Sequence, residues 1–226
     1  MKYMDGMQVI ESDIKDKVLK AMGEYDYNSY TAADVERALS HETCSIEDFK
    51  AFLSPCCSIV SGADGKKSRR DNKKSFWKHL IYIFTTILYY TNFNCQNYCI
   101  YCGFNCYNNI RRKKLNFQEI EHEMQVIAKT GMEEILLLTG ESRKYSDVEY
   151  IGEAVKIARK YFKNIGIEIY PVNVDEYKYL HECGVDYVTV FQETYNADKY
   201  ETLHLLGHKR VWPYRFDSQE RALMGA

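Results

Sequence analysis

The chain has 226 residues, of which 46% are hydrophobic and 27% charged, and its formal net charge at pH 7 is −2. This is a globular composition with enough apolar material for one sizeable core. The near-neutral charge does not indicate a nucleic acid or membrane partner, and the apolar run at 81–90 is too short to span a bilayer. The first residues contain no apolar core of a signal peptide.

Residues 1–54 are expected to form a helical N-terminal extension. Apolar residues recur at helical spacing between Val9 and Met22, and Thr31 and Ser45 are suitable N-caps for two further helices. Residues 55–76 have no apolar period and contain six basic residues within 66–74. This segment is predicted to be an irregular basic linker rather than a phosphate-binding patch.

From residue 77 onward, apolar runs typical of buried strands alternate with segments of helical periodicity. The expected strands are 80–89, 134–139, 165–170 and 187–191; the expected helices are one capped by Asn116 and stopped by Gly131, then 146–161, 177–181 and one from Asn196 toward Leu205. No fifth strand is expected after them. Alternation of this kind predicts an α/β fold, in which residues 77–226 form about four units of a partial parallel (β/α) TIM-like barrel.

Three cysteines follow the first expected strand at C-x3-C-x2-C spacing: Cys95, Cys99 and Cys102, with Tyr101 just before the third. Three thiolates on a tight loop suit an iron–sulfur cluster. A [4Fe–4S] cube held by three cysteines leaves one iron able to bind a small molecule through an amine and a carboxylate. The remaining cysteines show no disulfide framework, so a reducing, cytoplasmic compartment is expected.

Cys106 adds a fourth thiol, separated from Cys102 by three residues. A structural Zn site or a four-cysteine electron-transfer cluster is therefore the alternative, although zinc sites commonly separate two ligand pairs by a longer loop. Polar residues also follow other expected strands, namely Gly140-Glu141 and Gln192-Glu193. Because the carboxyl ends of barrel strands form one face, we expect these residues and the cysteines to share a site.

The cysteine spacing resembles that of the radical S-adenosylmethionine (SAM) superfamily. Within it, residues from about 79 to 226 resemble the tyrosine lyases, and most closely the 2-iminoacetate synthases of thiamine biosynthesis. The matching motifs are Leu-Leu-Leu-Thr-Gly-Glu-Ser-Arg at 136–143, Ile-Glu-Ile-Tyr-Pro at 167–171, Val-Phe-Gln-Glu-Thr-Tyr at 190–195 and Arg-Phe-Asp-Ser-Gln-Glu-Arg-Ala at 215–222. The tyrosine lyases of hydrogenase maturation are the alternative, but their second strand ends in Ala-Gly-Glu-Asp rather than Thr-Gly-Glu-Ser.

The resemblance implies a [4Fe–4S] cluster held by Cys95, Cys99 and Cys102, with SAM on the open iron. A 5′-deoxyadenosyl radical would take hydrogen from the amino group of L-tyrosine, and cleavage of the Cα–Cβ bond would give 2-iminoacetate and p-cresol. The implied cofactor-binding residues are Tyr101, against the adenine; Gly140 and Glu141, at the SAM ammonium; Arg143, for a carboxylate; and Glu168 and Gln192, for ribose or substrate. A flavodoxin or ferredoxin as reductant and thiazole synthase are the implied partners.

The sequence departs from the family pattern in three places. Residues 55–76 lack an expected amphipathic helix, an extra Asn94 precedes Cys95, and family members continue for well over a hundred residues beyond the position of Ala226. Half a parallel barrel exposes a strand edge and an apolar face. We therefore expect this chain to bind a cluster but to cleave tyrosine poorly, as a truncated and inactive fragment would.

Overall fold

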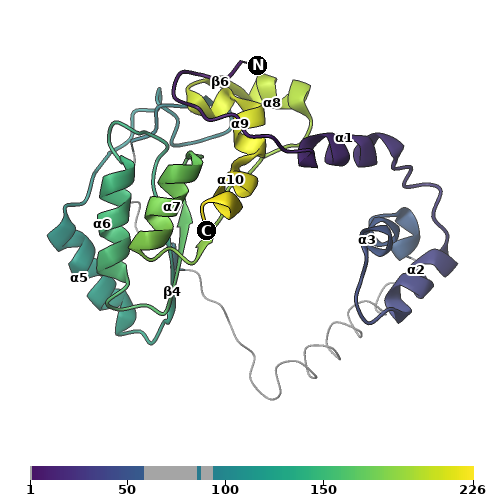
Figure 1. Cartoon of the computed structure of the whole chain (residues 1–226), viewed down its shortest axis with the longest axis horizontal. Helices are drawn as coiled ribbons and strands as arrows, with labels where there is room; N and C mark the ends of the chain where they lie inside the picture. The colour runs from purple at the N-terminus through teal and green to yellow at the C-terminus, as the bar shows by residue number, and fades with distance from the viewer. Residues whose placement is uncertain (1, 59–85, 88–93) are drawn as a thin grey trace. The chain divides into compact units, whose positions relative to one another are not determined.

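The computed structural model describes residues 2–58, 86–87 and 94–226 (Figure 1). The chain divides into two compact units, one of Met1–Ser12 with Ile83–Ala226 and one of Asp13–Tyr82. Residues up to Ser12 thus belong with the α/β unit and not with the helices that follow them. The domain boundaries expected near residues 54 and 76 stay a prediction, since residues 59–85 lie outside the described residues, as does the basic run at 66–74.

The α/β unit is built on a parallel sheet of four described strands. They are β1 (Thr86–Ile87), β3 (Glu134–Leu138), β4 (Asn164–Glu168) and β5 (Tyr187–Val188), hydrogen-bonded in the order β1-β3-β4-β5. Neighbouring strands pair in parallel throughout, with Leu136 opposite Gly166 at the centre of the longest ladder. The predicted partial parallel barrel is confirmed; most of the expected first strand, 80–89, lies outside the described residues.

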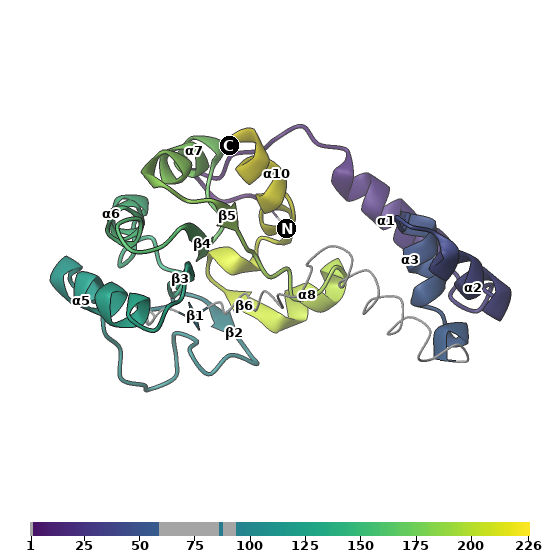
Figure 2. The same cartoon turned by 90° about the horizontal axis from the view of Figure 1, so that it is seen from below.

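Three helices run along one face of this sheet, as in the outer layer of a β/α barrel (Figure 2). They are α5 (Phe117–Ala128), α6 (Val148–Ala158) and α7 (Val174–Cys183). Asn116 caps α5 in a capping box with Glu119, as predicted, and Gly131 follows the helix at a φ of 88°. Because the strands are parallel and a helix stands between each strand and the next, all strands end at the same edge of the sheet.

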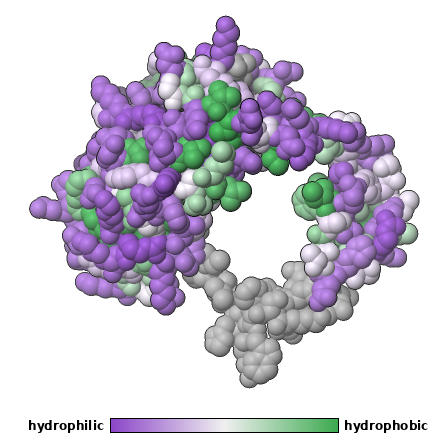
Figure 3. Space-filling view, in the orientation of Figure 1, coloured by the Kyte–Doolittle hydropathy of each residue, from purple (hydrophilic) through white to green (hydrophobic). Residues whose placement is uncertain are grey.

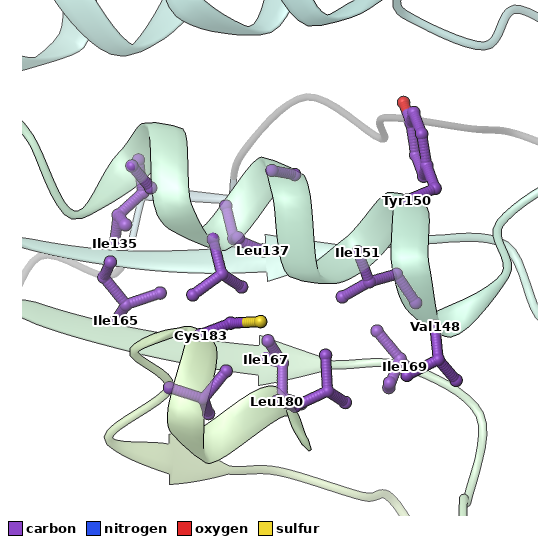
Figure 4. Packing of buried hydrophobic residues seen from close by; sticks show 14 of the residues in the cluster. Ile135, Leu137, Val148, Tyr150, Ile151, Ile165, Ile167, Ile169, Leu180 and Cys183 are labelled. Atoms are coloured by element: carbon purple, nitrogen blue, oxygen red, sulfur yellow. The ribbon is translucent and has the colours of Figure 1, made fainter. Parts of the chain in front are cut away.

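The core lies between these helices and the sheet (Figure 4). Ile135 and Leu137 of β3 and Ile165 and Ile167 of β4 are all at most 2% exposed. Side chains from α6 and α7 close over them; Figure 4 shows Val148, Ile151, Leu180 and Cys183 around the strand residues. Burial of this apolar area is the main stabilising contribution to the unit, and it fixes the positions of the strand ends.

The chain after β5 forms an arrangement that sequence periodicity did not predict. Its elements are α8 (Ala197–Leu203), β6 (His204–Leu206), η2 (His208–Arg210), α9 (Trp212–Phe216) and α10 (Ser218–Met224). Strand β6 pairs antiparallel with β2 (Tyr98–Cys99), inside the cysteine run. The helix expected from Asn196 toward Leu205 is present as α8 with Asn196 as its N-cap, but it ends at Leu203. His204–Leu206 then form a strand that was not expected and that pairs with a distant segment outside the four-stranded parallel sheet.

The second unit consists of short helices: α1 (Ile14–Glu24), α2 (Ala32–Ser40), α3 (Ile46–Phe52) and the 3₁₀ turn η1 (Pro55–Ser58). The predicted caps are confirmed, since Thr31 forms a capping box with Asp34 and Ser45 forms one with Asp48. The buried hydrophobic residues between α2 and α3 are small: Val35, Ala38 and Ala51. The apolar material of this unit therefore forms only a small core among its described residues.

Hydrophilic side chains cover most of the face of the α/β unit that Figure 3 shows, with small groups of hydrophobic side chains between them. Among the helices that the structure describes, none combines the length and apolar character needed to cross a bilayer.

Candidate active site

The cysteine run forms a tightly turned loop held by its own backbone. The amide of Cys102 donates to the carbonyl of Cys99 at 3.1 Å, and the amide of Cys106 donates to the carbonyl of Asn97 at 3.0 Å. Cys99 lies in β2 and is buried, while Cys95 and Cys102 are partly buried. None of these three thiols is in a disulfide, and each is at least partly buried, so the loop presents three motif sulfurs that are partly shielded from solvent.

Backbone N–H groups point toward these sulfurs. The amide of Phe104 donates to Sγ of Cys102 at 3.4 Å. Burial raises the pKa of the Cys95 thiol, against the lowering effect of the backbone amides of Asn97 and Glu141. Burial also raises the pKa of Cys99 to about 11, although the charge of Lys209 opposes this. Burial makes these thiols costly to ionise without a metal ion. A bound soft metal ion would stabilise the thiolate form, and the amide donors would support it.

The three motif cysteines form a donor set that suits an iron–sulfur cube. Within the described part of the chain, no three side chains of His, Cys, Asp or Glu converge as they would around one metal ion. A cube distributes its thiolate ligands over different irons, so its cysteines need no common centre, and the N–H groups that face Cys95 and Cys102 suit thiolate ligands.

Glu141 packs directly against the start of the cysteine loop. Its Oε2 accepts from Nδ2 of Asn97 at 3.0 Å, and its Oε1 lies 3.0 Å from Nη1 of Arg215. Its backbone carbonyl accepts from the amide of Gln96, also at 3.0 Å. Burial acts to raise the pKa of Glu141, but Arg215 and Lys209 outweigh it and hold that pKa below its usual value. The turn after β3 therefore presents an ionised carboxylate beside the motif cysteines, with Gly140 preceding it.

A second carboxylate joins this network from the end of β5. Glu193 accepts from Nζ of Lys209 at 2.6 Å, and the same Nζ lies 3.7 Å from Glu141. Glu193 has a φ of 69°, a left-handed conformation that costs free energy for a residue other than glycine. The two carboxylates, one after β3 and one after β5, thus share one lysine.

Three buried polar atoms that follow strands have no hydrogen-bond partner among the described residues: Oγ1 of Thr139, Oγ of Ser142 and Nε2 of Gln192. Unsatisfied buried polar groups are rare in native proteins and often face a ligand. Glu168, at the end of β4, accepts a long 3.4 Å contact from Oγ1 of Thr189, and burial raises its pKa. Gln192 and Glu168 stay predicted ligand-binding residues, now located at one edge of the sheet.

Tyr101 is held by a residue from β6. Its hydroxyl lies 2.7 Å from Nε2 of His204, and the two rings meet edge to face. Burial raises the pKa of Tyr101 and lowers that of His204. The Tyr101 side chain is nevertheless about half exposed, so one part of it remains open to a ligand.

Arg143 has a different environment from the one expected for a substrate ligand. Its guanidinium forms a two-point ion pair with Glu176 of α7, with Nη2 at 2.9 Å from Oε2, and lies over the ring of Tyr170. It lines a cavity of about 340 Å³ whose wall also includes Gln96, Glu141 and His208. Arg143 is therefore near the site, but its charge is already matched by a carboxylate of the protein.

Sequence reasoning missed four residues that organise this site: Asn97, Lys209, Arg215 and His204. Arg215 stood in the matched segment 215–222 without an assigned role. Asn97 lies within the cysteine run itself, whereas His204 in β6 and Lys209 in η2 reach that run through the β2–β6 pairing, which no local spacing could show.

Comparison with known proteins gives a consistent result. A family model described as the Radical SAM superfamily matches residues 89–223. The 2-iminoacetate synthases of Salmonella typhimurium and Escherichia coli are each 34% identical over 194 residues, which cover 86% of this chain and 51% of theirs. The 3-methylornithine synthase of Methanosarcina barkeri is 29% identical over 126 residues, 54% of this chain and 36% of that protein.

Solved structures show the same fold. HydG, a maturase of the [FeFe]-hydrogenase, superposes with a TM-score of 0.78 over 100% of this chain and 50% of its own, at 22% identity. Methylornithine synthase (PylB) gives a TM-score of 0.61 over 94% of this chain and 56% of its own, also at 22% identity. The chain spans about half the length of the curated 2-iminoacetate synthases that it matches.

Proposed function

The chain belongs to the Radical SAM superfamily, whose members use a [4Fe–4S] cluster and SAM, and from this premise we propose that Cys95, Cys99 and Cys102 hold that cluster beside Glu141. The observation that carries the proposal is the double contact between the cysteine loop and the turn after β3, through the Asn97 side chain and the Gln96 amide. This contact keeps an ionised carboxylate close to the sulfurs.

The residues around the loop have complementary roles in this proposal. The N–H groups facing Cys95 and Cys102 stabilise thiolate charge. Glu141 accepts hydrogen bonds from the SAM ammonium, with Gly140 allowing close approach, and the exposed part of Tyr101 covers the adenine. Gln192 and Glu168 offer polar atoms to the ribose or the substrate. Together the bound cluster and SAM supply a 5′-deoxyadenosyl radical.

The proposed reaction is cleavage of the Cα–Cβ bond of L-tyrosine to 2-iminoacetate and p-cresol. It is supported by the 34% identity to two 2-iminoacetate synthases over most of this chain. A low-potential flavodoxin or ferredoxin as electron donor, thiazole synthase as partner and a cytoplasmic location complete the proposal. The alternative of hydrogenase maturation rests on likeness at 22% identity, which is evidence of fold alone.

Anaerobic reconstitution with iron and sulfide tests the cofactor part of the proposal. We expect a reduced [4Fe–4S] EPR signal that changes when SAM is added, and release of 5′-deoxyadenosine. One Zn per chain, or a cluster signal indifferent to SAM, would contradict it and support a four-cysteine site with Cys106.

Release of p-cresol from L-tyrosine, measured in the same reconstituted sample with a low-potential reductant, tests the substrate separately. Comparison with a full-length 2-iminoacetate synthase sets the scale. If the sample forms 5′-deoxyadenosine but releases no p-cresol when tyrosine is supplied, tyrosine cleavage is not an activity of this chain. The cofactor assignment would still stand.

A further inference from the structure

We propose that His204 is a positioning residue, which fixes the orientation of Tyr101 so that its ring can cover the adenine of SAM. The inference rests on the proposed function for the identity of the ligand, but the contact itself is a property of the chain. His204 lies outside the cysteine motif, a hundred residues further along the sequence.

The first step is the place of His204 in the fold. It begins β6, where it pairs with Cys99 of β2, and it is only 1% exposed. The amide of Ile100 donates to the carbonyl of Leu203 at 3.1 Å and extends this pairing. The backbone of His204 is therefore attached to the same loop that carries Tyr101, so the two side chains keep a fixed separation.

The second step is the direction of the hydrogen bonds. Nδ1 of His204 lies 2.8 Å from the carbonyl oxygen of Tyr200. A carbonyl only accepts, so Nδ1 carries the hydrogen, and in the neutral ring Nε2 is left as an acceptor. Nε2 is the atom 2.7 Å from the Tyr101 hydroxyl, which therefore donates to it. The backbone carbonyl of Tyr200 thus leaves Nε2 of His204 as an acceptor for Tyr101, whose hydroxyl is also within hydrogen-bonding reach of Cys99 and Glu193.

The third step is the rigidity of the histidine ring. The Tyr200 ring stacks on it, with centroids 3.8 Å apart and planes 25° apart. Tyr200 is fully buried, and its hydroxyl donates to the carbonyl of Lys209 at 2.5 Å. Lys209 in turn binds Glu193 and approaches Glu141. A continuous set of contacts therefore connects the aromatic residue beside the cysteines with the two carboxylates of the site.

The physical reason for such a support is the exposure of Tyr101. A half-exposed phenol without a partner would sample several rotamers, and a ligand that stacks on it would have to restrict that motion at an entropic cost. A hydrogen bond to a buried acceptor restricts it before the ligand arrives. Support of this kind around a cofactor site is a common contribution to affinity.

The first experiment is ¹⁵N NMR of the histidine side chains in the chain as isolated, without cluster or SAM. We expect His204 to show the Nδ1-protonated form, and Tyr101→Phe to shift the Nε2 resonance of His204 while leaving His181 unchanged. His181 is a suitable control because its Nδ1 also contacts a backbone carbonyl, that of Val185. A proton on Nε2, or no response to Tyr101→Phe, overturns the proposal whatever the chain binds.

The second experiment measures SAM affinity and the SAM-induced EPR change of reconstituted variants at equal iron content. His204→Asn keeps an amide N–H near the position of Nδ1 but loses the acceptor for Tyr101, whereas His204→Gln places an amide near Nε2. We expect His204→Asn to weaken SAM binding about three- to tenfold, as Tyr101→Phe does, and His204→Gln to bind close to normally.

The double variant Tyr101→Phe/His204→Asn separates positioning from general damage. If His204 acts through the Tyr101 hydroxyl, the double variant binds SAM no more weakly than either single variant. Additive losses, or normal binding by His204→Asn, overturn the proposal. Failure of the unaltered chain to bind SAM would instead refute the proposed function, and the NMR result would still decide the contact.

Discussion

The turn after β3 carries two charged side chains, Glu141 and Arg143, whose environments differ in a way that their sequence spacing does not reveal. Glu141 is largely buried and contacts three segments, through Asn97, Lys209 and Arg215. Arg143 is more exposed, and its ion pair joins it to one helix through Glu176. The first side chain connects the cysteine loop to the C-terminal helices, and the second connects the turn to α7.

This difference separates two kinds of ionic contact. A buried carboxylate held by several donors is costly to leave unpaired, and it is suited to meeting a cationic group of a ligand. A partly exposed pair of side chains contributes less free energy and is screened by salt. The cysteine-loop side of the turn is therefore expected to be the functional side, and the α7 side mainly supports the fold.

The largest expected effect concerns the cysteine loop itself. Cys99→Ala should lose nearly all bound iron after reconstitution, because a cube with two thiolates releases iron readily. Cys106→Ala should keep the cluster and its response to SAM, since the other three thiols are unchanged. Iron content and EPR measure both variants. Equal loss in the two would mean that the loop holds a four-cysteine site, and Glu141 would then need another role.

A large effect on stability is expected from Arg215→Met, which removes the guanidinium and keeps a long apolar side chain. Arg215 is 5% exposed, donates from Nε to the carbonyl of Phe191 and pairs with Glu141. Breaking a buried pair on one side costs about 3–5 kcal/mol of unfolding free energy. Arg143→Met, the matched control on the other pair, should cost about 1 kcal/mol. Similar unfolding midpoints in guanidinium chloride for the two variants would remove the distinction between the pairs.

Local sequence signals were sufficient for much of the fold. Apolar runs located β3 and β4, and side-chain caps located α5, because both depend on residues a few positions apart. The expected strand at 187–191 is shorter in the structure, where only Tyr187–Val188 pair with β4. The β2–β6 ribbon could not be predicted, since its register depends on two segments about a hundred residues apart.

The same contrast applies to the site. Cysteine spacing and the Gly140-Glu141 pair follow expected strands, so their convergence could be predicted from strand order. Arg143 could be named from its chemistry, but the sequence did not show that Glu176 would be its partner. Lys209 and His204 reach the site only through the chain after β5, where no periodic signal indicates the path.

An intermediate effect is expected from Gly207→Ala, because this residue packs against the amide partner of Glu141. Gly207 has a φ of 88°, and an added Cβ would lie 2.1 Å from Oδ1 of Asn97 and 2.9 Å from its Cα. Gly131 has the same φ but open space around it, so Gly131→Ala measures backbone strain alone. We expect about 1 kcal/mol of destabilisation for Gly131→Ala and about 2–3 kcal/mol for Gly207→Ala.

The comparison of these two glycine variants also has a functional readout. Displacement of Asn97 should loosen its hydrogen bond to Glu141, so Gly207→Ala should bind SAM more weakly than Gly131→Ala at equal iron content. Equal stability and equal SAM binding in the two variants would show that the contact between Gly207 and Asn97 does not position the loop.

The smallest expected effect is the pH dependence that the Arg143–Glu176 pair contributes. Burial acts to raise the pKa of Glu176, but hydrogen bonds from Arg143 and from the amide of Asn173 leave it below its usual value. Below the unfolded-state pKa, about 4.3, the unfolded chain binds the proton more readily than the native one. The stability from this pair is therefore present above that pH and is lost as the pH falls through the native pKa.

Glu176→Gln should remove this contribution, which is about 1 kcal/mol near neutral pH. The loss of stability between about pH 6 and pH 3.5 should then be smaller in the variant than in the unaltered chain, as measured by urea midpoints at each pH. Glu153→Gln is the control, because its carboxylate pairs with Lys156 on the surface of α6 and both side chains are about half exposed. A Glu176→Gln profile parallel to that of the unaltered chain would mean that Arg143 does not hold the carboxylate in solution, and Arg143 would then be available to a substrate carboxylate after all.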